Sequence, residues 1–104
     1  MLTIDFLYTD DCPHCSEALI ALKEVLSEEH VEADLNMTMV ASEEGAEQLK
    51  FLGSPTIRMN GEDIEPGIKH RADYHGHCRL YVYHEQIFDQ PPKEMIREVL
   101  KKYL

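Results

Sequence analysis

The feature that most constrains the fold is a change of hydrophobic period across a pair of cysteines. Residues 2–8 are mostly apolar, β-branched or aromatic, as in a strand buried on both faces. From Pro13 onwards the apolar residues recur at helical spacing, in a stripe made of Ala18, Leu19, Leu22, Val25 and Leu26. Cys12-Pro13-His14-Cys15 stands at the junction. A strand that leads through a cysteine pair into a helix predicts an α/β domain.

A second strand and a second helix follow. Residues 31–39 alternate between apolar and polar side chains, which predicts a strand. Three methionines on predicted strands are expected to face the core: Met37, Met39 and Met59. Ser42 can cap the N-terminus of a short helix, and Gly53 can end that helix.

A β-hairpin and a last helix complete the chain. Asn60-Gly61 between two short predicted strands, residues 54–59 and 62–65, is a strong local signal for a hairpin turn. Residues 66–90 form an excursion in which residues 80–83 fit either a short strand or a packed loop. Pro91-Pro92 then begins a helix that runs towards the C-terminus. The predicted order is βαβαββα, in a single domain over residues 1–104.

The charge of the chain narrows its possible partners. There are 20 acidic and 10 basic residues, for a formal net charge of −10. Nucleic acids and anionic membrane surfaces need a cationic face, so we expect neither as a partner. No apolar run approaches the roughly 18 residues that span a bilayer. Residues 1–8 lack the features of a signal peptide, which favours the cytoplasm, where a cysteine pair is more often catalytic or metal-binding than structural.

The spacing of Cys12 and Cys15 suits thiol–disulfide chemistry. At the N-terminus of a helix, free N–H groups and the helix dipole favour the thiolate of Cys12, and His14 adds positive charge. Cys15 can then resolve a mixed disulfide on Cys12. The alternative is half of a zinc site, which usually needs a second such pair that this chain lacks. We therefore favour redox chemistry over metal binding, and both over inert cysteines.

Ser54-Pro55 lies between the second helix and the hairpin. A proline at this place can simply mark the start of a strand. The more specific interpretation is a cis peptide bond beside the cysteine pair, since cis bonds to proline occur in tight turns. We expect this arrangement to leave the backbone of Ser54 free to pair with an extended substrate segment.

Cys78 is the third cysteine, and its role stays open. One interpretation is a small buried side chain beneath residues 80–83. Another is a third thiolate close to Cys12 and Cys15, which would resolve an intermediate or bind a soft metal. A zinc or copper site could also combine Cys78 with three histidines of the same segment: His70, His75 and His77.

Taken together, these residues resemble the thioredoxin-like superfamily. The resemblance is carried by Cys12-Pro13-His14-Cys15, Gly53-Ser54-Pro55-Thr56, Asn60-Gly61, residues 78–81 and Pro91-Pro92, and it covers nearly the whole chain. The chain is similar to small cytoplasmic thioredoxin- and glutaredoxin-like proteins. That similarity implies a mixed four-stranded sheet flanked by about three helices, with a cis-proline loop. Asp11 departs from thioredoxin, which has a tryptophan before its first cysteine.

We therefore predict a thiol–disulfide oxidoreductase without a cofactor. The predicted site has two catalytic cysteines and four substrate-groove residues: Cys12 and Cys15, then Pro13, His14, Ser54 and Pro55. The expected partner is a protein or small-molecule thiol or disulfide, the electron donor is not named by the sequence, and the chain is expected to be a monomer. The alternative function is binding of a soft metal such as mercury or copper through the three thiols of Cys12, Cys15 and Cys78.

Overall fold

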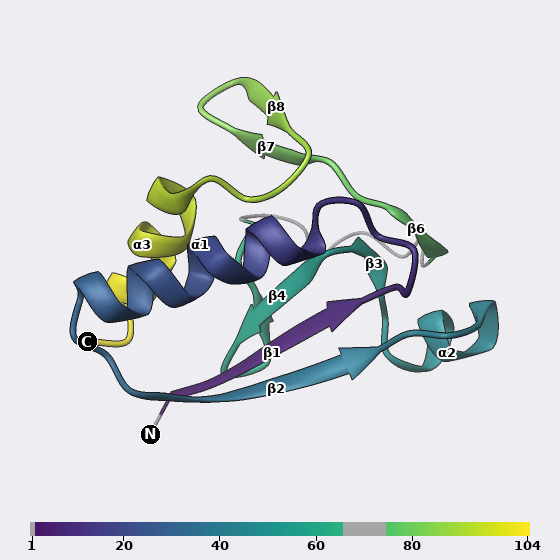
Figure 1. The fold of residues 1–104 in the computed structure, drawn as a ribbon, viewed down its shortest axis with the longest axis horizontal. Helices are drawn as coiled ribbons and strands as arrows, with labels where there is room; N and C mark the ends of the chain where they lie inside the picture. The colour runs from purple at the N-terminus through teal and green to yellow at the C-terminus, as the bar shows by residue number, and fades with distance from the viewer. Residues whose placement is uncertain (1, 66–74) are drawn as a thin grey trace.

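A mixed four-stranded sheet lies at the centre of the computed structural model, which describes residues 2–65 and 75–104. Its strands, in spatial order, are β2 (Ala33–Met39), β1 (Leu2–Tyr8), β4 (Thr56–Met59) and β5 (Glu62–Asp63). β1 runs parallel to β2 and antiparallel to β4, and β4 runs antiparallel to β5. The predicted α/β class with a mixed four-stranded sheet is thus confirmed (Figure 1).

The described residues form three helices: α1 (Cys15–Glu28), α2 (Glu43–Gln48) and α3 (Lys93–Lys101). Helices α1 and α3 contact each other beside the strands, whereas α2 lies beyond the end of β2 (Figure 1). No helix in the described part of the chain is long and apolar enough to cross a membrane.

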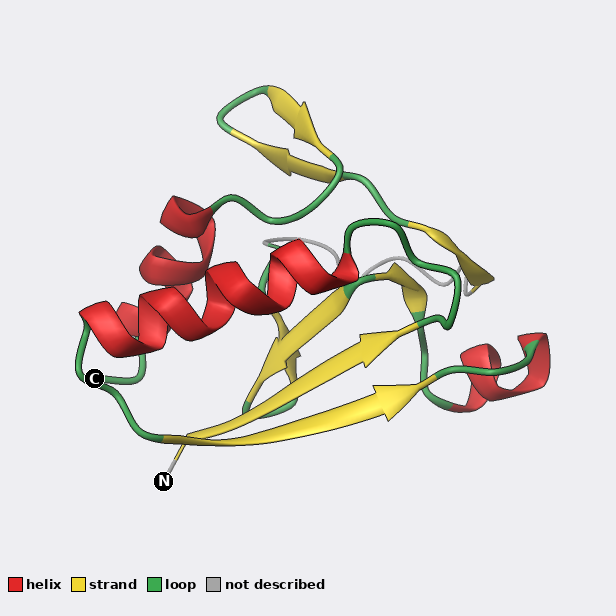
Figure 2. Ribbon diagram, viewed as in Figure 1, coloured by secondary structure: helices red, strands yellow, loops and turns green. Residues whose placement is uncertain are grey.

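Two small strand pairs stand outside the central sheet (Figure 2). β3 (Leu52–Ser54) pairs in parallel with β6 (His75–Cys78). β7 (Tyr81–Tyr83) and β8 (Gln86–Phe88) form an antiparallel hairpin. Residues 75–90 of the expected excursion therefore contain three short strands. Its residues 66–74, with His70, lie outside the described residues.

The core explains why β1 is central. Ile4 and Phe6 are almost completely buried and join the main apolar cluster with α1 and α3. Leu7 points to the other face, because side chains alternate along a strand, and joins a smaller cluster with Val40, Ala46 and Phe51. A strand covered on both faces is mostly apolar, as residues 2–8 are.

Two local signals in the sequence are confirmed. The hydroxyl of Ser42 accepts a hydrogen bond of 3.0 Å from the N–H of Gly45, so Ser42 caps α2. Asn60 and Gly61 both have positive φ, 50° and 86°, in the turn between β4 and β5. That backbone suits the two central residues of a type I′ hairpin turn.

Two helix boundaries differ from the prediction. Helix α1 begins at Cys15 instead of Pro13, because the carbonyl of His14 accepts the N–H of Ala18 and opens the helical hydrogen-bond series. Helix α2 ends at Gln48, and Lys50, with φ 54°, follows its end in the left-handed conformation, so the helix stops before Gly53. Gly53 instead lies within β3.

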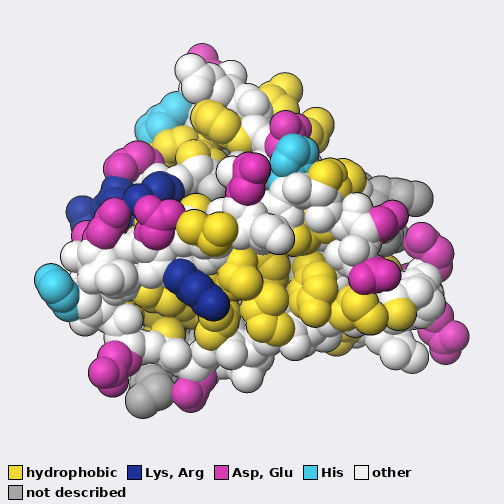
Figure 3. All heavy atoms as spheres, viewed as in Figure 1, with side chains coloured by type: hydrophobic (Ala, Val, Ile, Leu, Met, Phe, Trp, Pro, Cys, Tyr) yellow, Lys and Arg dark blue, Asp and Glu magenta, His cyan; other side chains and the backbone are white. Residues whose placement is uncertain are grey.

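The prediction that all three strand methionines face the core is wrong for two of them. Met59 is fully buried, but Met37 and Met39 expose 45% and 50% of their surface. Both lie on β2, which is an edge strand of the sheet. Hydrophobic side chains accordingly remain visible between α1 and β2 in Figure 3. Alternation along a strand shows which residues share a face, but it does not show whether a helix covers that face.

Candidate functional site

Cys12 and Cys15 form a disulfide, with their Cα atoms 5.6 Å apart. Both residues are partly exposed. The N–H of Cys12 donates to the carbonyl of Thr9 at 3.3 Å, which closes the turn after β1. Cys12 therefore stands in this turn ahead of α1, and it is Cys15 that begins the helix. The prediction that Cys12 itself lies at the N-terminus of the helix is therefore wrong.

The side chain of Ser54 joins the cysteine pair to the end of β1. Its hydroxyl oxygen accepts the N–H of Thr9 at 3.0 Å and lies 3.0 Å from the Sγ atom of Cys15. A disulfide sulfur carries no proton, so in this contact the hydroxyl of Ser54 donates to the sulfur of Cys15. A donated hydrogen bond stabilises negative charge on that sulfur when the disulfide opens. The peptide bond between Ser54 and Pro55 is cis.

The carbonyl of Ser54 is not free, contrary to our expectation. It accepts the N–H of Arg79 at 3.0 Å, and Ser54 is paired with Cys78 between β3 and β6. The physical reason is that β6 and Arg79 lie along the edge of β3, so the chain supplies the partner strand itself. Ser54 is consequently only 1% exposed.

Arg79 anchors this returning segment with a buried guanidinium group. Two nitrogens of Arg79 each donate to one carboxylate oxygen of Asp63 at 2.7 Å, and a third contact reaches Glu65 at 3.3 Å. The side chain also donates to the hydroxyl of Thr56 at 3.1 Å and lies over the ring of Tyr81. Burial acts to lower the pKa of Arg79, but the carboxylates, first of all Asp63, raise it overall, so the group stays charged.

Tyr81 makes the next contact along the same segment. Its hydroxyl donates to the carbonyl of Pro55 at 2.5 Å, and its side chain is fully buried. Burial raises the pKa of Tyr81 above its usual value, so the phenol remains a protonated donor. Arg79 and Tyr81 thus hold the backbone on both sides of the Ser54–Pro55 bond.

His14 and Pro13 border the disulfide on the outside. Pro13 is exposed, and the imidazole of His14 lies 3.7 Å from a carboxylate oxygen of Asp89, a contact that becomes an ion pair when the imidazole is protonated. Asp89 directly follows β8, so the chain after the last hairpin reaches His14, which lies between the two cysteines in the sequence.

Comparison of the sequence with models of protein families identifies the family of this chain. Residues 2–99 match the model of a family described as a domain of unknown function, DUF2703. The chain belongs to the DUF2703 family. A search of curated proteins finds no match.

In this DUF2703 protein Cys78 is exposed, and its thiol is not in a disulfide. The interpretation of Cys78 as a small buried side chain is therefore wrong. No group of three histidine, cysteine or acidic residues in the described part of the chain lies close enough to hold a metal ion, so the three cysteines do not form such a group here. The histidine site cannot be placed, because His70 and the side chains of His75 and His77 lie outside the described residues.

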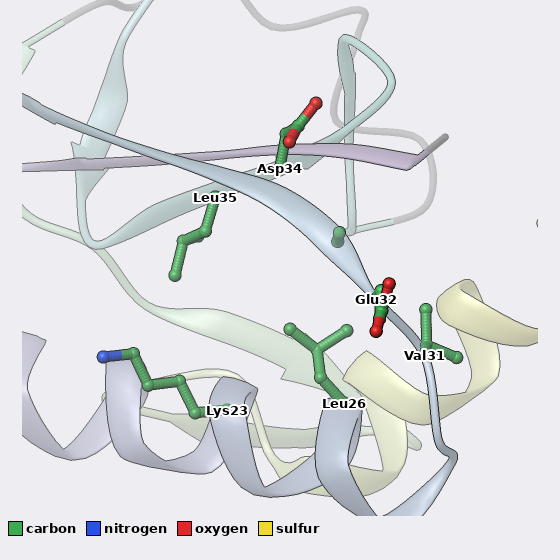
Figure 4. A pocket seen from close by; sticks show the side chains of 7 residues that line it. Lys23, Leu26, Val31, Glu32, Asp34 and Leu35 are labelled. Carbon is green, nitrogen blue, oxygen red and sulfur yellow. The ribbon is translucent and has the colours of Figure 1, made fainter.

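The DUF2703 protein has a hollow between α1 and β2 that lies away from the cysteines. Figure 4 shows Leu26, Val31 and Leu35 at this hollow, with Lys23 on the side of α1. These residues belong to the second half of α1 and the chain that follows it, whereas Cys15 begins the helix. The hollow therefore plays no part in the candidate site.

Sequence reasoning missed three residues that shape the site of this DUF2703 protein: Arg79, Tyr81 and Asp89. The first two act on the backbone around Pro55, and Asp89 faces His14. All three belong to the excursion, where no hydrophobic period could be recognised. The signal that could have found two of them was the segment 78–81, which contains Arg79 and Tyr81 and carries part of the resemblance to thioredoxin-like proteins.

Proposed function

We propose that this protein is a thiol–disulfide oxidoreductase built on a thioredoxin-like fold. The observation that carries the proposal is the Cys12–Cys15 disulfide with the hydroxyl of Ser54 directed at the sulfur of Cys15. The mixed four-stranded sheet and three helices are compatible with a thioredoxin-like fold. The cysteine motif and its place between β1 and α1 support the same fold.

We assign different roles to the two cysteines, and the hydrogen bond from Ser54 to Cys15 supports this assignment. In the reduced protein, the thiolate of Cys12 attacks one sulfur of a substrate disulfide, which forms a mixed disulfide and releases the first substrate thiolate. The thiolate of Cys15 then attacks the sulfur of Cys12, which restores the Cys12–Cys15 disulfide and releases the second substrate thiolate. Two electrons pass from the protein to the substrate. In the reverse direction Cys15 is the leaving group, and the hydroxyl of Ser54 stabilises its developing charge.

A redox titration tests this proposal. The protein with Cys78→Ser, which removes the exposed third thiol, is equilibrated with glutathione buffers of increasing oxidised fraction, quenched in acid, alkylated and weighed by mass spectrometry. We expect a reversible two-electron transition between the dithiol and the Cys12–Cys15 disulfide. The further change Cys15→Ser is expected to retain a mixed disulfide at Cys12, because the resolving thiol is missing.

Two results would contradict the proposal. One is a pair that neither opens nor closes across the whole range of glutathione buffers. The other is a Cys15→Ser variant that carries no more glutathione than the matched Cys12→Ser variant, since then Cys12 is not the attacking thiol.

A further inference from the structure

The loop beside the disulfide has no free backbone carbonyl in its three central residues. The carbonyl of Gly53 accepts the hydroxyl of Thr56 at 2.5 Å. The carbonyl of Ser54 accepts the N–H of Arg79 at 3.0 Å, and that of Pro55 accepts the hydroxyl of Tyr81 at 2.5 Å. The chain thus supplies its own donor to each of these three carbonyls, which an extended peptide would need for backbone pairing.

The strand that fills this position is held firmly. β6 pairs with β3 along the edge next to the disulfide, and Arg79 follows it directly. The guanidinium of Arg79 is tied to Asp63 by two hydrogen bonds of 2.7 Å, with the Arg79 side chain 1% and the Asp63 side chain 10% exposed. Removing Arg79 from this place would leave a buried carboxylate without its partner, which is costly. We therefore expect β6 to stay in place when a substrate arrives.

The cysteines themselves are not covered in the same way. Cys12 and Cys15 are both partly exposed, and Pro13 between them is exposed. A small disulfide can therefore approach the sulfur of Cys12 from solvent without displacing β6. A polypeptide that binds by adding a strand needs an open sheet edge, and that edge is already occupied.

We propose that this site acts on low-molecular-weight disulfides and excludes extended polypeptide disulfides, because β6 occupies the strand position beside Ser54. The proposal rests on the proposed thiol–disulfide chemistry and names its substrate class. The step is the one given above: the thiolate of Cys12 attacks the small disulfide, and Cys15 resolves the mixed disulfide.

The test measures the rate at which disulfides of equal charge oxidise the reduced Cys78→Ser protein. The small substrate is the disulfide of N-acetylcysteine N-methylamide. The polypeptide substrates are the disulfide-linked dimer of an uncharged nonapeptide with a central cysteine, and the same dimer with N-methylated backbone amides. Each rate constant for oxidation of the protein is divided by the rate constant for oxidation of dithiothreitol by the same disulfide. This division corrects for differences in intrinsic reactivity among the disulfides. The variant that also carries Cys12→Ser is the control for reaction at the site.

We expect the normalised rate for the small disulfide to exceed that for the nonapeptide dimer by about tenfold or more. N-methylation is expected to leave the nonapeptide rate unchanged, since no strand is added. A nonapeptide rate equal to or above that of the small disulfide would overturn the proposal, as would a clear loss of rate on N-methylation. If no disulfide reacts at Cys12, the proposed function itself fails, and the substrate class fails with it.

Hydrogen exchange gives a second readout that does not depend on activity. The amide of Arg79 is expected to exchange at least about a hundredfold more slowly than an unstructured amide, because it is held by the carbonyl of Ser54. Exchange at the unstructured rate would show that the edge of β3 is open, and it would overturn the proposed exclusion.

Discussion

Ser54 connects three parts of the candidate site. Its hydroxyl accepts the N–H of Thr9 at the end of β1 and donates to the sulfur of Cys15. Its carbonyl accepts the N–H of Arg79. One buried residue therefore positions the disulfide and also holds the strand that covers the loop. The two tasks use different atoms, so the side chain can be changed while the backbone contact is kept.

We predict that Ser54→Ala slows reduction of the oxidised protein by glutathione by about tenfold or more. A hydrogen bond to a charged group contributes about 1.5–3 kcal/mol, and here it acts on the charge that develops on Cys15 as the disulfide opens. The measurement is the second-order rate constant at fixed pH. Ser42→Ala is the matched control, because it also removes a capping hydroxyl, costing about 1 kcal/mol of stability, but lies on α2. Equal rates for both variants would show that the hydroxyl of Ser54 does not act on the sulfur.

Single residues differ in how far their role could be predicted. Cys12, Cys15 and Ser54 stand in short motifs whose spacing already indicates chemistry. Arg79 lies in the segment 78–81, which carries part of the resemblance, but arginine is rarely buried, so the sequence assigned this side chain no role. Its burial depends on Asp63 and Glu65, which come from a different strand and the turn after it.

At the scale of elements, ion pairs join α1 to α3 on the surface. Glu28 near the end of α1 accepts from Lys93 at 2.9 Å and from Arg97 at 2.6 Å. The hydrogen bonds from Lys93 and then Arg97 hold the pKa of Glu28 below its usual value of 4.5. A carboxyl group whose pKa is lowered by folding stabilises the protein above its unfolded pKa, and this stabilisation is lost as the pH falls through the folded pKa.

We predict that Glu28→Gln lowers thermal stability slightly at pH 7 and has no effect once the pH is well below 4.5. The pairs are exposed, so the difference is also expected to shrink at about 1 M salt, where charges are screened within about 3 Å. The measurement is the difference in melting temperature between the unchanged protein and the Glu28→Gln variant, from pH 3 to pH 7. Glu47→Gln, on α2, is the control for a change of charge alone. A difference that persists unchanged at pH 3 would mean that Glu28 stabilises the helix contact through packing.

The elements that could be predicted are those with local causes. The cap of α2 at Ser42 and the turn at Asn60-Gly61 depend on a few neighbouring residues, and both agree with the structure. β6 is different, because its partner β3 lies at a distance along the chain and its own residues show no alternation of apolar side chains. The exposed face of β2 could not be predicted for a related reason, since the burial of Met37 and Met39 depends on what packs against the edge strand and not on their own alternation.

For the molecule as a whole, the formal net charge of −10 is the dominant surface property. Some of this charge lies close to the candidate site. Asp10 and Asp11 are exposed directly before Cys12, and Asp89 lies beside His14. A negative field at the site raises the local concentration of cations and lowers that of anions.

We predict that cystamine, a cationic disulfide, oxidises the reduced protein faster than the anionic oxidised glutathione. Each rate constant is divided by that of the same disulfide with dithiothreitol. The ratio of the two normalised rate constants, cystamine over oxidised glutathione, is expected to be about tenfold at low salt and to fall towards unity at about 1 M salt. Stopped-flow measurements on the Cys78→Ser protein provide the rates. The Asp10→Asn, Asp11→Asn double variant should narrow the gap at low salt. A gap that is independent of salt would indicate a specific contact with one of the two disulfides.

The contacts of Ser54 also set the time at which the site can exist during folding. The bond to Thr9 joins residues 45 positions apart, and the contact with Cys15 joins residues 39 positions apart. The bond from Tyr81 to Pro55 spans 26 positions. Contacts between such distant residues form only after long loops have closed, which places them late in folding. A chain that is still incomplete or partly unfolded therefore carries Cys12 and Cys15 as ordinary thiols, and the reactivity that we propose for them requires the finished fold.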